Sequence, residues 1–449
     1  MTSSTVQITS PVFRSLFTPE LKVLSEMFKE RGFELRIAGG AVRDILMNIV
    51  PVDIDLATTA TPDQMKLMFQ ENEIRMINVG GEKHGTVTAR INDQENYEIT
   101  TLRIDKVTDG RFAEVEFTRD WVVDANRRDL TINSMFLDLE GNLFDFFNGS
   151  EDLQKRVIRF VGEPDKRIQE DYLRILRYFR FFGRISNGPD DHVPETLAAI
   201  ARNVEGLERI SGERLWTELR QIMVGRFGDS VIVKMMDTGV AAHLGLPAQL
   251  NVEELDVVWK RCHAMKPKPI TIITALLHSE EDINKLDERL KLSNEECSLG
   301  VFILRHRFNP ALLDFCKSNS NADPFFPYRR LLAEEMLNLP KPNWAKSHCI
   351  ELLKYRGDSV LLQAMEEFEV PKFPVTGHRL LAIEAVPKGG RQTAHVLHSL
   401  RAAWIRSDFT RTEDELLTVD LPVILHNLQH QTEERGEKKP KKARNKNCS

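Results

Sequence analysis

Residues 33–58 read FELRIAGGAVRDILMNIVPVDIDLAT and hold the most informative pattern in the chain. An alternating apolar run ends in two glycines, Gly39 and Gly40, and a run with helical character follows. Glycines let the backbone approach a phosphate closely, and the helix behind them offers N-terminal amides and the positive end of its dipole. Arg43 adds a fixed positive charge. The pattern predicts a phosphate-binding turn, with an ordinary tight turn between strand and helix as the alternative.

Two aspartates, Asp53 and Asp55, follow this turn. In a strand, residues two apart point to the same face, so the two carboxylates are expected side by side. Such a pair is costly unless a divalent cation binds, and oxygen ligands suit Mg²⁺ bound to a nucleoside triphosphate. The alternative is two solvated acids at the end of a strand. The position after the turn favours a catalytic metal site.

The surrounding sequence predicts an α+β fold. Period-2 alternation and β-branched residues predict strands at 33–40, 84–91, 97–104 and 113–118, and a Thr-Pro start predicts a helix at 61–69. From about residue 170 the apolar period becomes helical, at 170–185, 194–207, 211–223 and 270–278. We therefore expect an N-terminal α/β head followed by an all-helical remainder.

Length, charge and composition limit the classes of protein to which this chain can belong. At about 100 to 200 residues per domain, 449 residues suggest roughly two to four domains. The net charge is −6, but residues 155–184 carry nine Lys or Arg against four Asp or Glu, as a polyanion-binding site requires. Five cysteines without a C-x-x-C motif predict a reducing compartment. No apolar run reaches the ~18 residues of a membrane span, so no membrane association is expected.

Residues 127–135 read RRDLTINSM. Two arginines, an acid and a cluster of hydroxyl and amide side chains can hold phosphate and ribose groups. The same residues can equally begin a helix with Asp129 as its N-cap. Both interpretations stay open on the sequence.

In residues 170–180, EDYLRILRYFR, polar residues recur at three-residue steps: Asp171, Arg174, Arg177 and Arg180. The simple interpretation is an amphipathic helix with intrahelical ion pairs. A sharper one is that Asp171 and Arg174, adjacent on one helix face, match the amino donor and ring-nitrogen acceptor of cytosine and adenine. Guanine and uracil present the reverse pattern and would leave polar groups unpaired, at ~1–3 kcal/mol each.

The ordered set GGAVRD, VDIDLAT, EITTLR, RRDLTINSM, DFFNGSEDL, EDYLRILRYFRF and SGERLWTEL resembles the class II CCA-adding enzymes of the polymerase β-like nucleotidyltransferase superfamily, over about residues 30–225. The resemblance implies template-independent addition of C, C and A to the 3′ end of tRNA from CTP and ATP, by two-metal nucleotidyl transfer with Mg²⁺. It also implies five parts: a catalytic head at 1–150, a neck with the nucleotide-selecting helix at 151–210, a body at 211–310, a tail at 311–430 and a disordered basic C-terminus at 431–449.

The resemblance assigns roles to individual residues. Asp53 and Asp55 match the catalytic, metal-binding carboxylates. The implied nucleotide-binding residues are Gly39, Gly40, Arg43, Arg128, Asp171, Arg174, Arg177 and Arg180. Glu98 matches a third carboxylate, with a strand-end acid as the equal alternative. Residues 105–111, bounded by Asp105 and Arg111, resemble the flexible loop associated with switching from C to A addition.

Alternatives remain. Poly(A) polymerases share the head and neck, but residues 79–91 lack their basic-Phe signature, and CC-only enzymes would lack the loop at 105–111. A non-catalytic RNA-binding protein would not need both aspartates. The family serves mitochondria and cytoplasm in eukaryotes, while the N-terminus shows no clear transit peptide and the basic tail makes the nucleus a further candidate. The sequence does not predict the oligomeric state.

Overall fold

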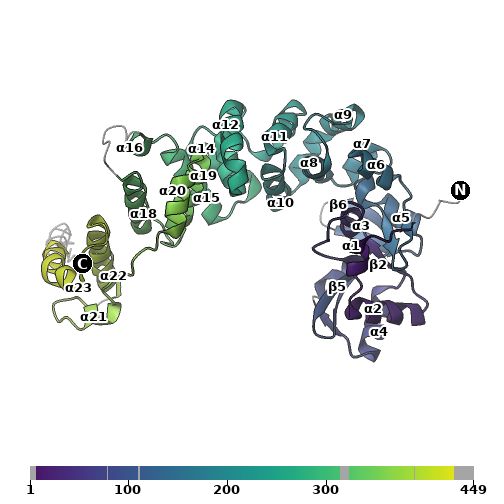
Figure 1. The fold of residues 1–449 in the computed structure, drawn as a ribbon, viewed down its shortest axis with the longest axis horizontal. Helices are drawn as coiled ribbons and strands as arrows, with labels where there is room; N and C mark the ends of the chain where they lie inside the picture. The colour runs from purple at the N-terminus through teal and green to yellow at the C-terminus, as the bar shows by residue number, and fades with distance from the viewer. Residues whose placement is uncertain (1–6, 78, 110–111, 314–322, 389, 429–449) are drawn as a thin grey trace, which may run out of the picture. The chain divides into compact units, whose positions relative to one another are not determined.

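The computed structural model describes residues 7–77, 79–109, 112–313, 323–388 and 390–428 (Figure 1). The chain forms two compact units. The first comprises Met1–Asp256 and Ala275–Ser293, and the second comprises Val257–Thr274 and Asn294–Ser449.

A seven-stranded sheet organises the N-terminal part of the first unit. Its order is β3-β4-β5-β2-β1-β8-β9; β2 and β5 are parallel, and the other neighbours are antiparallel. The strands are β1 (Leu35–Ala38), β2 (Asp55–Thr58), β3 (Arg75–Ile77), β4 (Thr86–Ile91), β5 (Glu95–Thr101), β8 (Phe136–Asp138) and β9 (Leu143–Phe144). A separate hairpin pairs β6 (Arg103–Asp109) with β7 (Phe112–Phe117).

Helices surround this sheet and continue beyond it. Several begin at a Ser-Pro or Thr-Pro pair, in which the hydroxyl caps the helix and proline takes the first position; Thr61 and Gln64 complete a capping box at α4. The helices that lie in the first unit are α1 (Pro11–Ser15), α2 (Pro19–Glu30), α3 (Gly40–Leu46), α4 (Pro62–Glu71), α5 (Trp121–Asn126), α6 (Gly149–Lys155), α7 (Pro164–Glu170), α8 (Arg174–Ile185), α9 (Pro194–Asn203), α10 (Gly212–Met223), α11 (Gly228–Asp237) and α14 (Glu280–Leu290).

A buried apolar cluster supports the carboxyl end of β1. Ala38, Leu102, Trp121 and Phe136 belong to it. The guanidinium of Arg36 lies over the ring of Trp121, at 3.9 Å from its centroid. This packing fixes the backbone just before Gly39.

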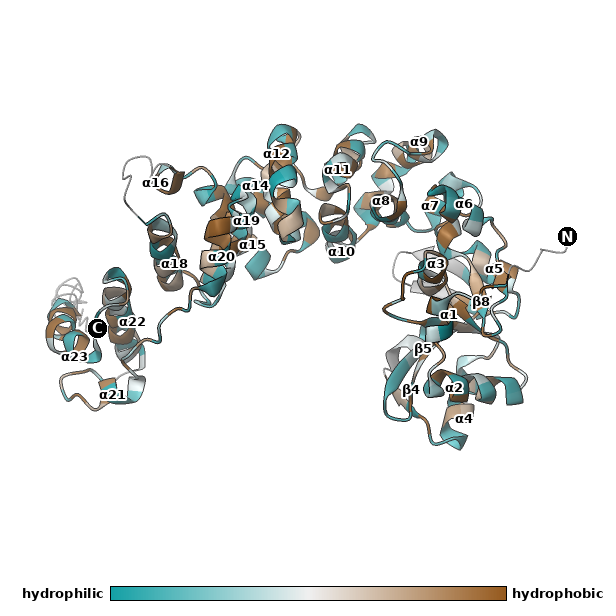
Figure 2. Cartoon of the chain, viewed as in Figure 1, coloured by the Kyte–Doolittle hydropathy of each residue, from teal (hydrophilic) through white to brown (hydrophobic). Residues whose placement is uncertain are grey.

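The second unit is helical throughout its described residues. It contains α13 (Pro269–Ile273), α15 (Asn294–His306), α16 (Pro310–Leu313), α18 (Phe326–Asn338), α19 (Trp344–Arg356), α20 (Ser359–Glu367), α21 (Gly377–Leu381), α22 (Gly390–Arg406), α23 (Glu413–Glu415) and a π-helical turn at Leu416–Asp420. Helix α12 (Val252–Cys262) runs across the boundary between the units. Among the described helices, which mix hydrophilic and hydrophobic residues in Figure 2, none is long and apolar enough to cross a membrane.

The predicted fold class is confirmed: the described strands all lie before residue 145, and helices follow. The prediction missed β3, β8 and β9, because strands of two or three residues are too short to show a period. It also merged residues 97–104 into one strand, whereas the structure ends β5 at Thr101 and begins β6 at Arg103.

Candidate active site

The Gly-Gly turn lies between β1 and α3, as predicted. Gly39 has φ = 61° and ψ = −118°, a conformation that side chains disfavour. A Cβ atom on Gly39 would lie 2.9 Å from Nη1 of Arg128. Glycine therefore lets the Arg128 guanidinium approach the turn, where it also donates to the Asn133 carbonyl oxygen at 3.3 Å.

The two aspartates behave differently from the strand prediction. Asp55 begins β2, but Asp53 lies in a bend before the strand, so the prediction that both share one strand face was wrong. The β1–β2 register runs from Leu35 opposite Thr58 to Ile37 opposite Leu56, so Asp53 lies upstream of the paired residues of β2. Asp53 is exposed to solvent.

Glu98 supplies a neighbouring carboxylate, because the parallel register places it directly beside Asp55. Partial burial, the charge of Glu98 and the charge of Asp53 raise the pKa of Asp55, while Arg128 opposes the shift. Acids that repel one another fit a cation, although no group of three or more possible metal-binding side chains is preformed in the described part of the chain. Carboxylate oxygens of this kind fit a divalent cation.

A cavity of about 670 Å³ opens in front of these acids. We call it the arginine-lined cavity, because nine of its described lining residues are arginines and five are acids. The arginines are Arg43, Arg103, Arg127, Arg128, Arg174, Arg177, Arg180, Arg184 and Arg214. The acids are Asp55, Glu98, Asp124, Asp129 and Asp171. Gly39 and Gly40 also line it, whereas Asp53 and Asp105 do not.

Asp124 of α5 holds two of these arginines. Its side chain is 1% exposed and accepts hydrogen bonds from Arg127 Nε at 2.8 Å and Arg128 Nη2 at 3.1 Å. Burial by itself would raise the pKa of Asp124, but Arg128 and Arg127 hold it below its ordinary value. The carboxylate therefore stays charged and fixes both guanidinium groups before any ligand arrives.

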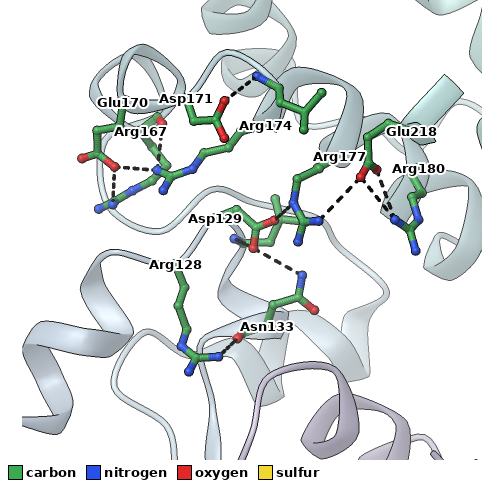
Figure 3. A network of polar contacts seen from close by, with 12 residues as sticks. Arg128, Asp129, Asn133, Arg167, Glu170, Asp171, Arg174, Arg177, Arg180 and Glu218 are labelled. Atoms are coloured by element: carbon green, nitrogen blue, oxygen red, sulfur yellow. Dashed lines mark hydrogen bonds and ion pairs between the residues drawn. The ribbon is translucent and has the colours of Figure 1, made fainter. Parts of the chain in front are cut away.

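Asp129 joins the head to α8 (Figure 3). Its Oδ2 accepts from Arg177 Nε at 2.6 Å, and its Oδ1 accepts from the backbone N–H of Leu130 at 2.8 Å. Arg177 outweighs the effect of burial and lowers the pKa of Asp129. The N-cap interpretation of Asp129 was therefore wrong: the short 3₁₀ helix that follows has Leu130 as its N-cap and no side-chain cap.

The arginines of α8 pair outside their own helix. Arg180 Nη1 lies 3.2 Å from Glu218 Oε2 of α10, and Arg184 Nη2 lies 3.1 Å from Asp44 Oδ2 of α3. On the opposite face, buried side chains such as Ile175 and Phe179 join the core. Because the ion pairs that Arg174, Arg177, Arg180 and Arg184 make with described residues all reach outside α8, the intrahelical alternative is not what the structure shows.

Asp171 lies outside α8. It has extended backbone (φ = −156°, ψ = 107°) between α7 and α8, so the prediction that it shares a helix face with Arg174 was wrong. The reason is local: its Oδ1 accepts from the N–H of Leu173 at 3.2 Å, and such a turn, in which the side chain bonds the backbone two residues on, competes with continued helix. Its Oδ2 accepts from Arg214 Nη2 of α10 at 2.7 Å.

Arg174, the first residue of α8, points toward α7 in Figure 3. Its Nη1 donates to Glu170 Oε2 at 2.5 Å and to the Arg167 carbonyl at 2.9 Å, and its Nη2 donates to the Arg127 carbonyl at 2.8 Å. A guanidinium has five N–H donors, and these contacts engage three of them.

Sequence reasoning missed several lining residues: Arg103, Asp124, Arg184 and Arg214. Arg214 lies within the quoted SGERLWTEL motif and Arg184 continues the three- and four-residue steps of α8, so both carried a signal. Arg103 also carried one, as the last residue of the quoted EITTLR motif, whereas Asp124 carried none. At the base of the β6–β7 hairpin, Asp105 lies 3.2 Å from Arg103 Nε, whereas Arg111 falls outside the described residues.

Comparisons with known proteins identify the family of this chain. A family model described as "Poly A polymerase head domain" matches residues 35–159, and one described as "Probable RNA and SrmB- binding site of polymerase A" matches residues 193–249. The chain is 51% identical over 414 residues to "CCA tRNA nucleotidyltransferase 1, mitochondrial" of Homo sapiens, which covers 92% of each protein.

Two solved structures share the fold. The Bacillus stearothermophilus CCA-adding enzyme in complex with CTP matches 95% of this chain and 100% of its own, with a TM-score of 0.67 and 22% identity. The Thermotoga maritima CCA-adding enzyme complexed with tRNA matches 94% and 99%, with a TM-score of 0.59 and 20% identity. The identity to the human protein, over nearly the whole of both chains, shows that this chain is an enzyme of the CCA tRNA nucleotidyltransferase family.

Proposed function

We propose that the arginine-lined cavity is where this enzyme adds C, C and A to the 3′ end of tRNA from CTP and ATP. The observation that carries the proposal is the composition of that cavity: nine arginines face one space of about 670 Å³, with Asp55 and Glu98 on β-strands at one wall and Asp171 between helices at another. Such a space suits a triphosphate between a metal-binding wall and a base-reading wall.

The triphosphate would lie between the Gly-Gly turn and α8. On the side of the turn, positive charge comes from Arg43 of α3 and from Arg128, whose guanidinium lies against Gly39. On the side of α8, it comes from Arg177 and Arg180. Buried or partly buried acids hold most of these side chains: Asp44 pairs with Arg43, Asp124 with Arg128, and Asp129 with Arg177. Because the arginines are already oriented, little reorganisation is required when the phosphates bind.

We assign the divalent cation to Asp55 and Asp53, with Glu98 as the third carboxylate. Mg²⁺ is the ion proposed, because carboxylate oxygen is the ligand it prefers. When bound, it lowers the pKa of the primer 3′ hydroxyl and neutralises charge on the α-phosphate and pyrophosphate. Asp55 positions the reacting phosphate relative to the primer, and Arg128 offsets part of the negative charge of the acids.

Asp171 and Arg174 are proposed to read the base. The Leu173 N–H and Arg214 hold the Asp171 carboxylate in one orientation, in which it can accept from the amino group of cytosine or adenine. The two uncommitted donors of Arg174 can serve the ring nitrogen. Selection thus comes from a linker residue and the first residue of a helix instead of from one helix face.

The remaining assignments are extensions of the same proposal. We infer that residues 105–111, predicted as a loop but with 105–109 in strand β6, support the switch from C to A addition. The head, neck, body, tail and basic end are proposed at 1–150, 151–210, 211–310, 311–430 and 431–449. The tRNA would bind basic helical surface by shape and backbone. By its relationship to the human protein, the enzyme is proposed to serve mitochondria, with cytoplasm and nucleus as further sites.

The test is incubation of the purified full chain with tRNA lacking CCA, with CTP, ATP and Mg²⁺, and separation of products at nucleotide resolution. The expected product carries three added nucleotides, C, C and A, and stops there. A ladder of A residues would instead indicate poly(A) synthesis, and products ending in CC would indicate a CC-only enzyme. Asp55→Asn should give no product, whereas the matched control Asp63→Asn, an exposed acid of α4, should behave as wild type.

A further inference from the structure

Gly206 lies outside the arginine-lined cavity but presses against the segment that carries Asp171. It sits in a 3₁₀ helix, Val204–Arg209, and is buried. A Cβ atom at this position would lie 2.0 Å from both Cδ1 and Cε1 of Tyr172 and 2.3 Å from Cγ. Real side chains do not tolerate such distances, so the face of the Tyr172 ring occupies the space that any other residue would need.

The glycine is not required by its own backbone. Its φ lies outside the left-handed range, so alanine could adopt the same conformation. The three atoms that an added Cβ would meet most closely all belong to the Tyr172 ring. The contact therefore acts on Tyr172, whose neighbour in sequence is Asp171.

The 3₁₀ helix is held on its far side and cannot easily yield. Arg289 of α14 donates from Nη2 to the Leu207 carbonyl at 2.8 Å and from Nη1 to the Ile210 carbonyl at 3.2 Å. Helix α9, directly upstream, is tied to α7, because Asn203 Nδ2 donates to Asp165 Oδ1 at 2.8 Å. A group added at Gly206 would consequently displace the ring and the linker rather than the 3₁₀ helix.

The linker transmits that displacement to the carboxylate. Asp171, Tyr172 and Leu173 form the short connection between α7 and α8, in which the N–H of Arg174 bonds to the Asp171 carbonyl at 3.0 Å and that of Ile175 to the Tyr172 carbonyl at 3.1 Å. Shifting Tyr172 therefore changes both the carboxylate position and its 2.7 Å pairing with Arg214.

We propose that Gly206 is a positioning residue for nucleotide choice: by admitting the Tyr172 ring, it fixes where the Asp171 carboxylate meets the base. This inference rests on the proposed role of Asp171. It assigns specificity to a residue that does not itself line the arginine-lined cavity.

The experiment measures kcat/KM for CTP, ATP, UTP and GTP with the full chain and tRNA acceptors. Gly206→Ala should lower efficiency with CTP and ATP on the order of tenfold and raise the relative use of UTP or GTP, since mispositioned polar groups discriminate less. Gly183→Ala is the matched control: its Cβ would meet Val231 at 3.7 Å, an ordinary contact, so specificity should not change.

Tyr172 variants keep the proposal testable if Gly206→Ala does not fold. Tyr172→Phe preserves the ring face and should retain wild-type selectivity, while Tyr172→Ala should lose it with little change in melting temperature, because this side chain is only half-buried. Normal selectivity in a folded Gly206→Ala and in Tyr172→Ala would overturn the inference. If Asp171→Ala itself kept strict selectivity, the proposed base-reading role would fail instead, so the two failures are distinguishable.

Discussion

The pKa values of individual carboxylates in this enzyme are shifted in opposite directions. Asp55 faces other acids and has a raised pKa, whereas Asp124 and Asp129 face arginines and have lowered pKa values. The difference follows from partners and not from burial alone, because burial pushes all three pKa values upward. The charge of Asp55 therefore destabilises the folded protein near neutral pH, whereas the charges of Asp124 and Asp129 stabilise it.

Asp55→Asn should abolish nucleotide addition and yet raise the melting temperature near neutral pH. Because the folded-state pKa lies above the unfolded value, stability falls as pH rises through the interval between them, and removing the charge removes that loss. Differential scanning fluorimetry from acid to neutral pH checks this. The melting temperatures of the wild type and Asp55→Asn should converge at pH values below the ordinary pKa of a carboxylic acid. Added Mg²⁺ should raise the melting temperature of the wild type only. A lower melting temperature for Asp55→Asn at neutral pH would contradict the electrostatic argument.

Asp129→Asn should have the opposite effect on stability and lower the free energy of unfolding at neutral pH. The lowered pKa means that the charged carboxylate contributes stability above its unfolded pKa, and this contribution is lost as pH falls through the folded-state value. Loss of the pairing with Arg177 should cost ~1–3 kcal/mol at neutral pH. Urea unfolding at neutral and acid pH measures this loss. The difference in the free energy of unfolding between the variant and the wild type should become smaller as pH falls. An equal gap at both pH values would mean that charge is not the cause.

At the scale of elements, the break between α7 and α8 matters more than the helix itself. A continuous helix from 170 would have placed Asp171 one turn before Arg174, but the aspartate side chain takes the Leu173 N–H and ends that continuity. The carboxylate is thereby held by α10, through Arg214, as well as by its own segment. Asp171 is thus positioned by α7, α8 and α10 together.

Asp171→Ala should lower kcat/KM for CTP and ATP and allow measurable UTP or GTP incorporation. The carboxylate would supply the acceptor for the amino group and repel the carbonyl oxygen of the wrong bases. As a simple ion pair it would be worth only ~0.2–1 kcal/mol and would not affect nucleotide choice. Four-nucleotide kinetics with a melting curve decide between these, and strict exclusion of UTP and GTP by a folded variant would remove Asp171 from selection.

Across the first unit as a whole, the nucleotide-binding region depends on a segment far away in sequence. Residues Ala275–Ser293 return to this unit, and Arg289 there donates to three backbone carbonyls, those of Leu207, His243 and Ile210. Gly212 at the start of α10 packs so closely that a Cβ would lie 2.1 Å from the Arg289 carbonyl oxygen. Helix α14 therefore braces the elements behind the cavity.

Arg289→Ala should destabilise the full chain by ~1–3 kcal/mol, because several backbone acceptors lose their donor. Lys285→Ala on the same helix is the control, since its exposed pairing with Glu281 should contribute little. Thermal or urea unfolding compares them. Equal stability of the two variants would show that α14 does not brace this region.

The sequence by itself determined the family, the α+β fold class and part of the cavity lining, and each rests on local information. Strand alternation, Thr-Pro helix starts and the Gly-Gly turn are each set by residues that are neighbours in sequence. The motifs can likewise be recognised from the sequence before the fold is known. Gly39, Arg128 and Arg177 could therefore be found without coordinates. The assigned roles, the domain boundaries and the loop switch stay predictions.

Only the tertiary structure decided which charged side chains lie next to one another. The parallel pairing of β2 with β5 brings Glu98 beside Asp55, and α5 brings Asp124 to Arg127 and Arg128. The structure also moved Asp53 out of its predicted strand and Asp171 out of its predicted helix. Sequence periodicity describes a segment in isolation, whereas strand ends and helix starts depend on which partner supplies the hydrogen bonds, and those partners lie far away along the chain.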